Sequence, residues 1–519
     1  MNTTISCASL EQPGNWRIVG VVLVLLVVTL PALPLLWHTI TTTDAMTWPF
    51  SGTFGSVLGN SVLVALTVAA VSLLFGLPVG VLVTFYEFPG RKILLALATL
   101  PLLVPSVLWA IGWSALVARL APTATDFVSG ITGCAFVFSM TTIPLVLLTS
   151  YAATMGLSAS QVDSARLAGG ERRVFWYAAR HAAIPALLAA LLGGVLTLSD
   201  PGPGQILGLR TAASEILISF SALYDFSLAA QQCVALTALV LIFAAPLAYF
   251  AGSRIASGML ARQTRRLRRV RHKTMATATI VVLTAFVLVG VITPMLGLTL
   301  PVRVDGEMFR RALSELGRTA GDTVLYATGA GAIAVLLGFL LTFFVGRQVR
   351  LKTVTLGAAF ALFSLPPALT SLGLIYLGTD APAWADPLFR SRLTVCLALG
   401  LRFFPVAAIL SMRAWNSAST SWALAAGIHG VPLITYLRRV ALPLVLPTGA
   451  VAMLLIALLA TADIGTVLLL HPPGAGSFPL AIFTVMANAP ESLVAALCLL
   501  YVIVSAGLVA LVWAGGNRL

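Results

Sequence analysis

Three charged residues lie inside or at the ends of long apolar stretches, where a charge is costly. Arg402 lies within an apolar run, and Asp200 and Asp463 each follow one. Ionisable residues in membrane spans tend to line the path of a solute or ion, and two carboxylates there would favour a cationic or metal-bearing solute. We therefore take Asp200, Asp463 and Arg402 as candidate pathway residues. The alternatives are an exposed helix end for each aspartate and, for Arg402, snorkelling to the interface or pairing with a carboxylate.

The residue patterns that enzymes and metal sites require are absent. A P-loop needs a lysine directly after glycine, and no lysine of this chain follows glycine. The histidines do not cluster with carboxylates, and the five cysteines lie mostly in apolar segments without disulfide or zinc spacing. We therefore expect no catalytic residue, no metal site, no cofactor and no ATP hydrolysis by this chain alone.

Composition places the chain in a membrane. It has 519 residues, of which 59% are hydrophobic and only 9% charged, and its mean hydropathy is +1.01. A soluble domain is normally about 25% charged. The net charge of +14 gathers in alternate loops, as the positive-inside rule describes, so it reports orientation and not a nucleic-acid partner. We expect an all-α polytopic membrane protein with cytoplasmic N- and C-termini.

Twelve apolar spans are predicted, six in each half of the chain. Backbone in lipid must satisfy its own hydrogen bonds, so each span is expected to be helical. The predicted spans are 17–38, 57–86, 92–118, 128–155, 184–200, 227–252, 275–298, 321–346, 353–378, 392–412, 443–463 and 491–514.

Glycine, proline and aspartate residues of the first half recur in the second half at an offset of about 262 residues. Pro105 with Gly112 recurs as Pro366 with Gly373, and Asp200 recurs as Asp463. We expect two tandem six-helix domains, 1–261 and 275–519, joined by a basic cytoplasmic linker, 262–274. The arginines of the linker suit contact with anionic lipid headgroups, and a specific lipid or regulatory site is the alternative.

One basic, glycine-containing loop lies at the matching place in each half. In the second half it contains Leu424, Ala425, Ala426 and Gly430 and ends in Leu442-Pro443. Small residues on successive helical positions let a partner approach closely, and glycine lets the chain turn between two short helices. Proline is tolerated in the first turn of the helix that follows.

The loop of the first half has Asp163, Ser164, Ala165 and Gly169 at the matching positions, and its proline is Pro185. Both loops resemble the cytoplasmic coupling loop of ABC importer permeases, whose signature is Glu-Ala-Ala, three residues, Gly, nine residues, Ile-x-Leu-Pro. Most of the chain is similar to the fused two-half permeases of the ferric-iron and thiamine uptake group.

This resemblance implies a permease of the bacterial inner membrane with two copies of a cytoplasmic ATP-binding subunit as partners. Each coupling loop would sit in a cleft of one copy, and a periplasmic binding protein would deliver the solute. Ferric iron or a thiamine-like cation is the expected solute, while polyamines, phosphonates and inorganic anions stay open. Membrane lipid is the remaining partner.

The loops also depart from the family pattern, and other functions remain. Asp163 keeps the acidic residue that Leu424 replaces, so we expect two unequal docking sites. A plain amphipathic connector is the alternative for each loop. For the whole chain the alternative is a secondary transporter of the major-facilitator kind, with two parallel six-helix halves, and a scaffold or receptor is a third option.

Overall fold

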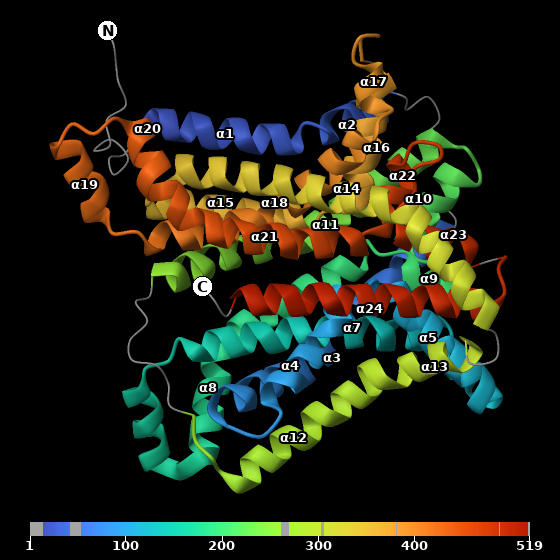
Figure 1. Cartoon of the computed structure of the whole chain (residues 1–519), viewed down its shortest axis with the longest axis horizontal. Helices are drawn as coiled ribbons and strands as arrows, with labels where there is room; N and C mark the ends of the chain where they lie inside the picture. Colours follow the sequence, from blue (N-terminus) through green and yellow to red (C-terminus); the bar gives the residue numbers. More distant parts are fainter. Residues whose placement is uncertain are drawn as a thin grey trace.

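The computed structural model describes residues 14–41, 53–260, 269–302, 306–379, 381–486 and 488–516. Nearly all of them are helical (Figure 1). The helices of the first half are α1 (Asn15–Thr29), α2 (Ala32–Thr41), α3 (Thr53–Phe85), α4 (Arg91–Leu103), α5 (Ser106–Leu120), η2 (Pro122–Ala124), α6 (Thr125–Val128), α7 (Gly130–Met155), α8 (Ala159–Thr197), α9 (Gly202–Ile206), α10 (Ala212–Ser221) and α11 (Phe226–Leu260).

The second half follows a similar order of long and short helices. Two of its segments, η3 and η4, are π-helical. The elements are α12 (Lys273–Val287), η3 (Leu288–Ile292), α13 (Thr293–Val302), α14 (Gly306–Val345), α15 (Val349–Ser364), α16 (Pro367–Thr379), α17 (Asp386–Phe389), α18 (Arg392–Ser417), α19 (Thr420–Ile428), α20 (Leu433–Tyr436), η4 (Leu437–Ala441), α21 (Leu442–Ala462), α22 (Ile464–Leu470), α23 (Phe478–Val485) and α24 (Glu491–Gly516).

The described residues contain nine helices long and apolar enough to cross a membrane, or up to twelve if each of three bent pairs counts as one span. The bent pairs are α1 with α2, α4 with α5, and α15 with α16. The expectation of an all-α chain with many apolar, membrane-length helices is therefore confirmed. The charged residues Glu307, Arg311 and Arg318 lie in the first turns of α14, which begins at Gly306.

Two of the bends fall at corresponding prolines. The axis turns by 101° between α4 and α5 and by 85° between α15 and α16. Val104 and Leu365, which precede Pro105 and Pro366, are both in extended conformation. Proline disfavours the α conformation in the residue before it, so each helix ends there and a new one begins in another direction. The sequence predicted these spans but not their bends.

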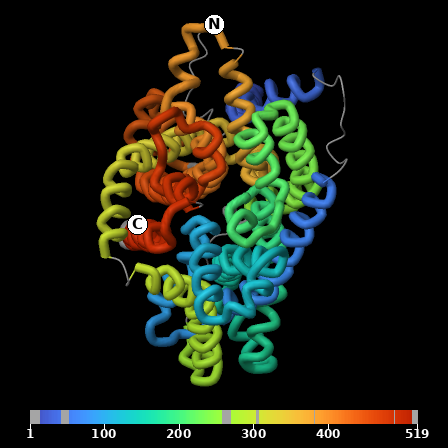
Figure 2. Tube along the Cα trace, turned by 90° about the vertical axis from the view of Figure 1, so that its right-hand side faces the viewer, coloured from blue at the N-terminus to red at the C-terminus, as the bar shows by residue number. Residues whose placement is uncertain are grey.

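The first span of each half packs against the other half. Helix α1 contacts α14 and α2 contacts α16, whereas α12 contacts α3 and α4, and α13 contacts α5. Figure 2 shows the yellow-green helices α12 and α13 among the blue and teal helices of the first half. Helices from before and after the predicted linker, 262–274, are therefore interleaved in space.

Two glycines make this exchange of helices possible. A Cβ on Gly112 of α5 would lie 2.5 Å from the carbonyl oxygen of Pro294 in α13, and one on Gly373 of α16 would lie 1.8 Å from that of Pro31, between α1 and α2. Small residues let two helix backbones approach closely inside a membrane. Gly112 and Gly373 occupy corresponding places in the two halves, so each half receives the other's first span on the same surface.

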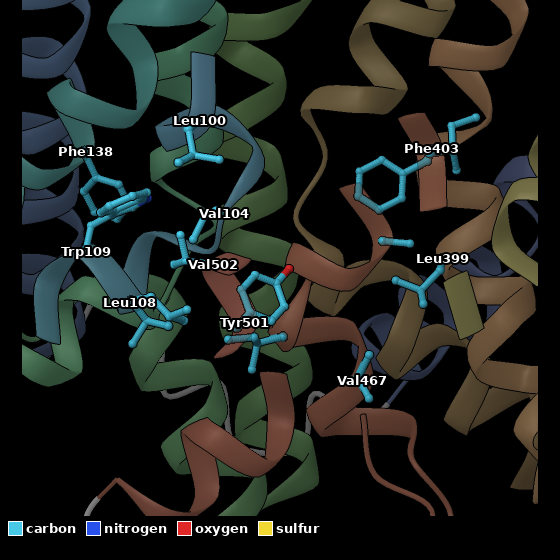
Figure 3. Packing of buried hydrophobic residues seen from close by; sticks show 14 of the residues in the cluster. Leu100, Val104, Leu108, Trp109, Phe138, Leu399, Phe403, Val467, Tyr501 and Val502 are labelled. Atoms are coloured by element: carbon cyan, nitrogen blue, oxygen red, sulfur yellow. The ribbon is translucent and has the colours of Figure 1, made fainter. Parts of the chain in front are cut away.

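The largest apolar core joins the two halves. Figure 3 shows Trp109 and Phe138 on one side, Phe403 of α18 on the other, and Tyr501 of α24 between them. All four belong to one cluster of buried residues. Because lipid is as apolar as these side chains, close packing between helices is what holds them together.

The two ends of the molecule differ. Figure 1 shows α19 and the first part of α8 at the left, which we call the loop end, and α10, α22 and α23 at the right, the far end.

The predicted linker lies partly outside the described residues, which resume at Arg269. There Val270 pairs with Tyr86, next to the end of α3, through a short parallel bridge. Cys7 and both chain termini also lie outside the described residues.

Candidate functional site

The first loop is a helix, a glycine turn and a second helix. A capping box between Ser158 and Gln161 starts α8. The helix breaks at Gly169 and Gly170, and φ is +64° at Gly170, a left-handed conformation that only glycine adopts cheaply. The sequence assigned the turn to Gly169, whose φ of 177° is ordinary extended backbone. The residue with left-handed backbone is Gly170, and the only sign of this in the sequence is that two glycines follow one another.

Polar contacts fix the first loop to α3. Arg166 donates from Nε to Glu171 at 2.6 Å and from a terminal nitrogen to Asp163 at 3.3 Å. The Tyr86 hydroxyl donates to the second oxygen of Glu171 at 2.7 Å. Burial tends to raise the pKa of Glu171, but the hydrogen bonds from Arg166 and Tyr86 outweigh it, so the pKa is lowered from its usual 4.5. Glu171 therefore stays ionised and holds the turn in place.

The second loop has the same outline but a different interior. Helix α19 ends at Ile428, Gly430 has φ of +66°, and α20 starts after Pro432. Apolar clusters support both loops: one with Phe85 and Val162 lies at the first loop, and another holds this loop to α18 and α21. The buried members of the latter cluster are Ala414, Trp415, Ala423, Tyr436, Ala441 and Val445.

Pro443 lies in the first turn of α21, as the sequence predicted, but α21 is not a separate helix because the π-helical segment η4 joins it to α20. The helix already begins at Leu433, and Leu442 lies where the π-helical segment η4 passes into α21. Proline has no N–H to donate, and a π segment before it accommodates the missing bond. In the first half, Pro185 lies inside α8, which stays helical on both sides of it.

Both loops expose apolar side chains at the same end of the molecule (Figure 1). Leu167 is 91% exposed in the first loop, and Ile428 and Ile434 are 84% and 73% exposed in the second. Among the predicted loop residues, Asp163, Ser164, Leu424 and Ala425 are also exposed, while Ala165 and Ala426 are half-buried. Large apolar side chains held out beside small ones are typical of a surface that contacts another protein.

The three charged candidates lie together near the far end of the spans. Arg402 Nε donates to Asp463 Oδ2 at 2.8 Å, and their side chains are 17% and 4% exposed. Asp463 also accepts from the backbone N–H and the hydroxyl of Thr466, each at 3.0 Å, which caps α22. Asp463 is therefore a buried ion-pair partner and not an exposed helix end. Of the alternatives for Arg402, pairing with a carboxylate is the one observed.

Asp200 faces a small, mostly apolar cavity in the first half that also carries hydroxyl groups. The Ser106 hydroxyl donates to its Oδ2 at 2.5 Å and the Gly202 N–H to its Oδ1 at 2.9 Å. The cavity measures about 170 Å³ and is also lined by Thr141, Thr142, Thr197 and, from the second half, Ala462. The charges of Asp463 and Arg402 both act on Asp200. The three charged groups thus form one cluster with a formal charge of −1.

Sequence reasoning missed the residues that complete these sites. Tyr86 and Ser106 gave no signal because their contacts, to Glu171 and to Asp200, join distant parts of the chain. Thr141 did leave a trace, because it lies three residues before Pro144 as Arg402 lies three before Pro405. Among the described residues no group of three or more His, Cys, Asp or Glu side chains is arranged to hold a metal ion.

Comparison with models of protein families, with curated protein sequences and with solved structures returned no match. The loops, the charged cluster and the resemblance of the loop motifs are therefore the features that bear on function.

Proposed function

We propose that this chain is the membrane-spanning permease of an ATP-driven importer, with both transmembrane domains fused in one polypeptide. The observation that carries the proposal is the pair of helix–glycine turn–helix loops. One lies in each half, both lie at the same end of the molecule, and both expose apolar side chains. Two matched docking loops suit a motor that binds as two copies.

The proposal includes a duplication of six spans. The bent pairs α4–α5 and α15–α16, the long helices α3 and α14, and the glycines that receive the exchanged first spans recur in the same order. A duplicated bundle gives the two-fold frame on which two motor subunits can act alike. The interleaving of α1 and α12 makes each half depend on the other, so the bundle moves as two coupled bodies.

In the proposed mechanism, ATP binding closes two cytoplasmic subunits and draws the loops together. Small residues, Ala165 and Ala425 with Ala426, let each short helix enter a cleft, and Gly170 and Gly430 set the angle at which its movement passes into α8 and α21. The bundle then opens toward a periplasmic binding protein at the far end. The loop end is cytoplasmic in this scheme, and the membrane is the bacterial inner membrane.

The permease performs no chemistry in this scheme, since ATP is hydrolysed in the separate subunits. A solute that enters the axial region meets the cluster of Asp200, Arg402 and Asp463, whose formal charge of −1 supports a cationic solute. Ferric iron and a thiamine-like cation are the candidates that the resemblance supplies.

A crosslinking experiment tests the proposal. A photo-crosslinking amino acid is placed at Ala165 in one variant and at Ala425 in another, in membranes of the native host. Both variants should capture the same ATP-hydrolysing protein, which is identified by mass spectrometry. The matched control is Leu223, which is 62% exposed between α10 and α11 at the far end. Capture from Leu223 and from neither loop position would refute the docking role.

A further inference from the structure

The Asp200 carboxylate has no cationic partner of its own. It accepts hydrogen bonds from Ser106 and Gly202, but among the described residues no Lys, Arg or His forms an ion pair with it. A carboxylate held within a membrane bundle is costly unless a positive charge compensates it. The open space beside Asp200 is the cavity of about 170 Å³, which exceeds the ~30 Å³ that one water takes in the liquid.

The second half shows what fills this place when a cation is present. Asp463 corresponds to Asp200, and the guanidinium of Arg402 pairs with it at 2.8 Å. Arg402 lies three residues before Pro405 in α18, and the residue three before Pro144 in α7 is Thr141. Thr141 lines the cavity of Asp200. One half therefore carries its own guanidinium, and the other has a short side chain and a cavity at the same position.

We propose that the cavity beside Asp200 binds the cationic group of the transported solute, an organic monocation with guanidinium, amidinium or ammonium N–H donors. The inference rests on the proposed function and names its class of substrate. The bound cation takes the place that Arg402 takes beside Asp463. Its charge neutralises the cluster. Thr141 and Thr197 line the cavity, and their hydroxyls donate to the backbone carbonyls of Phe138 and Gly194, which leaves lone pairs that can accept the remaining N–H bonds.

The lining fits an organic cation better than ferric iron. A small, highly charged ion needs several anionic or imidazole ligands around it. Here the cavity offers one carboxylate and neutral hydroxyls, and no cluster of three or more His, Cys, Asp or Glu was found in the described parts of the chain. A guanidinium, in contrast, is planar, weakly hydrated and satisfied by one carboxylate and a few oxygen acceptors.

Binding of radiolabelled methylguanidinium to the purified full-length chain in lipid nanodiscs tests the site. Methylurea, which has the same shape without the charge, is the competitor. We expect methylguanidinium to bind, methylurea to compete at least about tenfold more weakly, and Asp200→Asn to weaken binding by about tenfold or more, as loss of one charged hydrogen-bond partner implies. Thr141→Arg should abolish binding, because its guanidinium would occupy the site.

Asp322→Asn is the control, since Asp322 pairs with Arg392 at 2.6 Å, away from the cavity, and should leave binding unchanged. All variants are compared as monodisperse preparations. Equal binding by Asp200→Asn and the unaltered chain, or equal binding of methylurea, would overturn the site. No motor subunit is present in this assay, so loss of the site is separate from failure of the importer proposal, which the loop crosslinks test.

Discussion

The two loops at the loop end have the same outline and different interiors. In the first, Arg166, Glu171 and Tyr86 join the turn to α3 through an ion pair and a hydrogen bond. Both loops also rest on an apolar cluster, which contains Phe85, Val162 and Val174 at the first loop and Trp415 and Tyr436 at the second. The glycine turn is common to both, and φ is +64° at Gly170 and +66° at Gly430. The turn and its apolar support are therefore what both loops preserve, and the ion pair with its hydrogen bond is what the first loop adds.

The difference has a physical consequence. Ion pairs near a surface weaken with salt and with protonation, whereas apolar packing does neither. The first loop should respond to pH and ionic strength and the second should not. Under the proposed function, a motor subunit bound to the first loop would meet a support that is more sensitive to solution conditions than that of the second loop.

The largest effect is expected from changing the shared turn. Valine at Gly430 would force a β-branched residue into a left-handed conformation, a strain of about 1–3 kcal/mol. We expect Gly430→Val to reduce the ATP-driven change in distance between the loops by at least about tenfold. The variant should still insert into the membrane. The movement is measured as the distance between spin labels at Leu167→Cys and Ile428→Cys in a Cys7→Ser background.

Gly170→Val should have the same effect, and Gly507→Val serves as the control because Gly507 has open space around it in α24. A normal ATP-driven change in distance in Gly430→Val would remove the turn from the mechanism and leave the loops as simple connectors.

A smaller effect is expected from emptying the apolar cluster of the second loop. Trp415 is 9% exposed and packs edge-on against Phe339 and Phe343 at centroid distances of 6.3 and 6.4 Å. Trp415→Ala should cost about 3–5 kcal/mol of local stability, as for other buried aromatic residues. Tryptic cleavage at Arg438 and Arg439 should rise, and cleavage at Arg172 and Arg173 should not. Equal exposure of both loops would show that the clusters are not independent.

Glu171→Gln should produce the opposite pattern with a smaller magnitude. Losing the charge at the centre of the first loop should cost about 1.5–3 kcal/mol, the value of hydrogen bonds to a charged group. Cleavage at Arg172 and Arg173 should rise while the second loop stays protected. Equal protection of the first loop before and after the change would mean that Tyr86 and Arg166 contribute nothing to its order.

The pH dependence follows from the same carboxylate. The pKa of Glu171 is lowered in the folded loop, so its contribution is present above the usual value of 4.5 and is lost as the pH falls through the lowered value. Hydrogen exchange, corrected for its intrinsic pH dependence, should show the first loop loosening in that range. The second loop should keep its protection, and parallel loosening of both would contradict the contrast between them.

The smallest effect is expected from Leu424→Asp, which gives the second loop the acidic residue that Asp163 supplies in the first. Leu424 is 45% exposed, so stability should change by no more than about 0.5 kcal/mol. The affinities of the two loops for a motor subunit, measured by titration in native mass spectrometry, should become closer. An unchanged difference would place the cause of unequal docking elsewhere in the loops.

Sequence reasoning reached the spans and the loops because both are local features. Apolar runs of span length predicted the helices, and glycine with small residues marked each turn. The bends at Val104 and Leu365 depend on the conformation before a proline, and nothing in the apolar pattern says how far the chain turns there. The exchange of α1 and α12 was out of reach, because hydropathy does not tell which helix packs on which.

The charged cluster was partly within reach. A charge in a span needs a partner, so pairing was among the predictions for Arg402, and Asp463 was already a candidate beside it. Within the described part of the chain, Asp200 has no cationic partner because the first half has Thr141 at the place where the second half has Arg402. This becomes visible only when the repeat and the cavity are seen together.

The stoichiometry of the assembled complex tests the central claim most directly. Native mass spectrometry of the full-length chain, purified from its host in mild detergent, should show one chain with two copies of an ATP-hydrolysing subunit, and Gly430→Val should change the ATP-driven loop movement without changing that count. A chain that carries no such subunit and takes up solute into liposomes with a proton gradient alone would contradict the account.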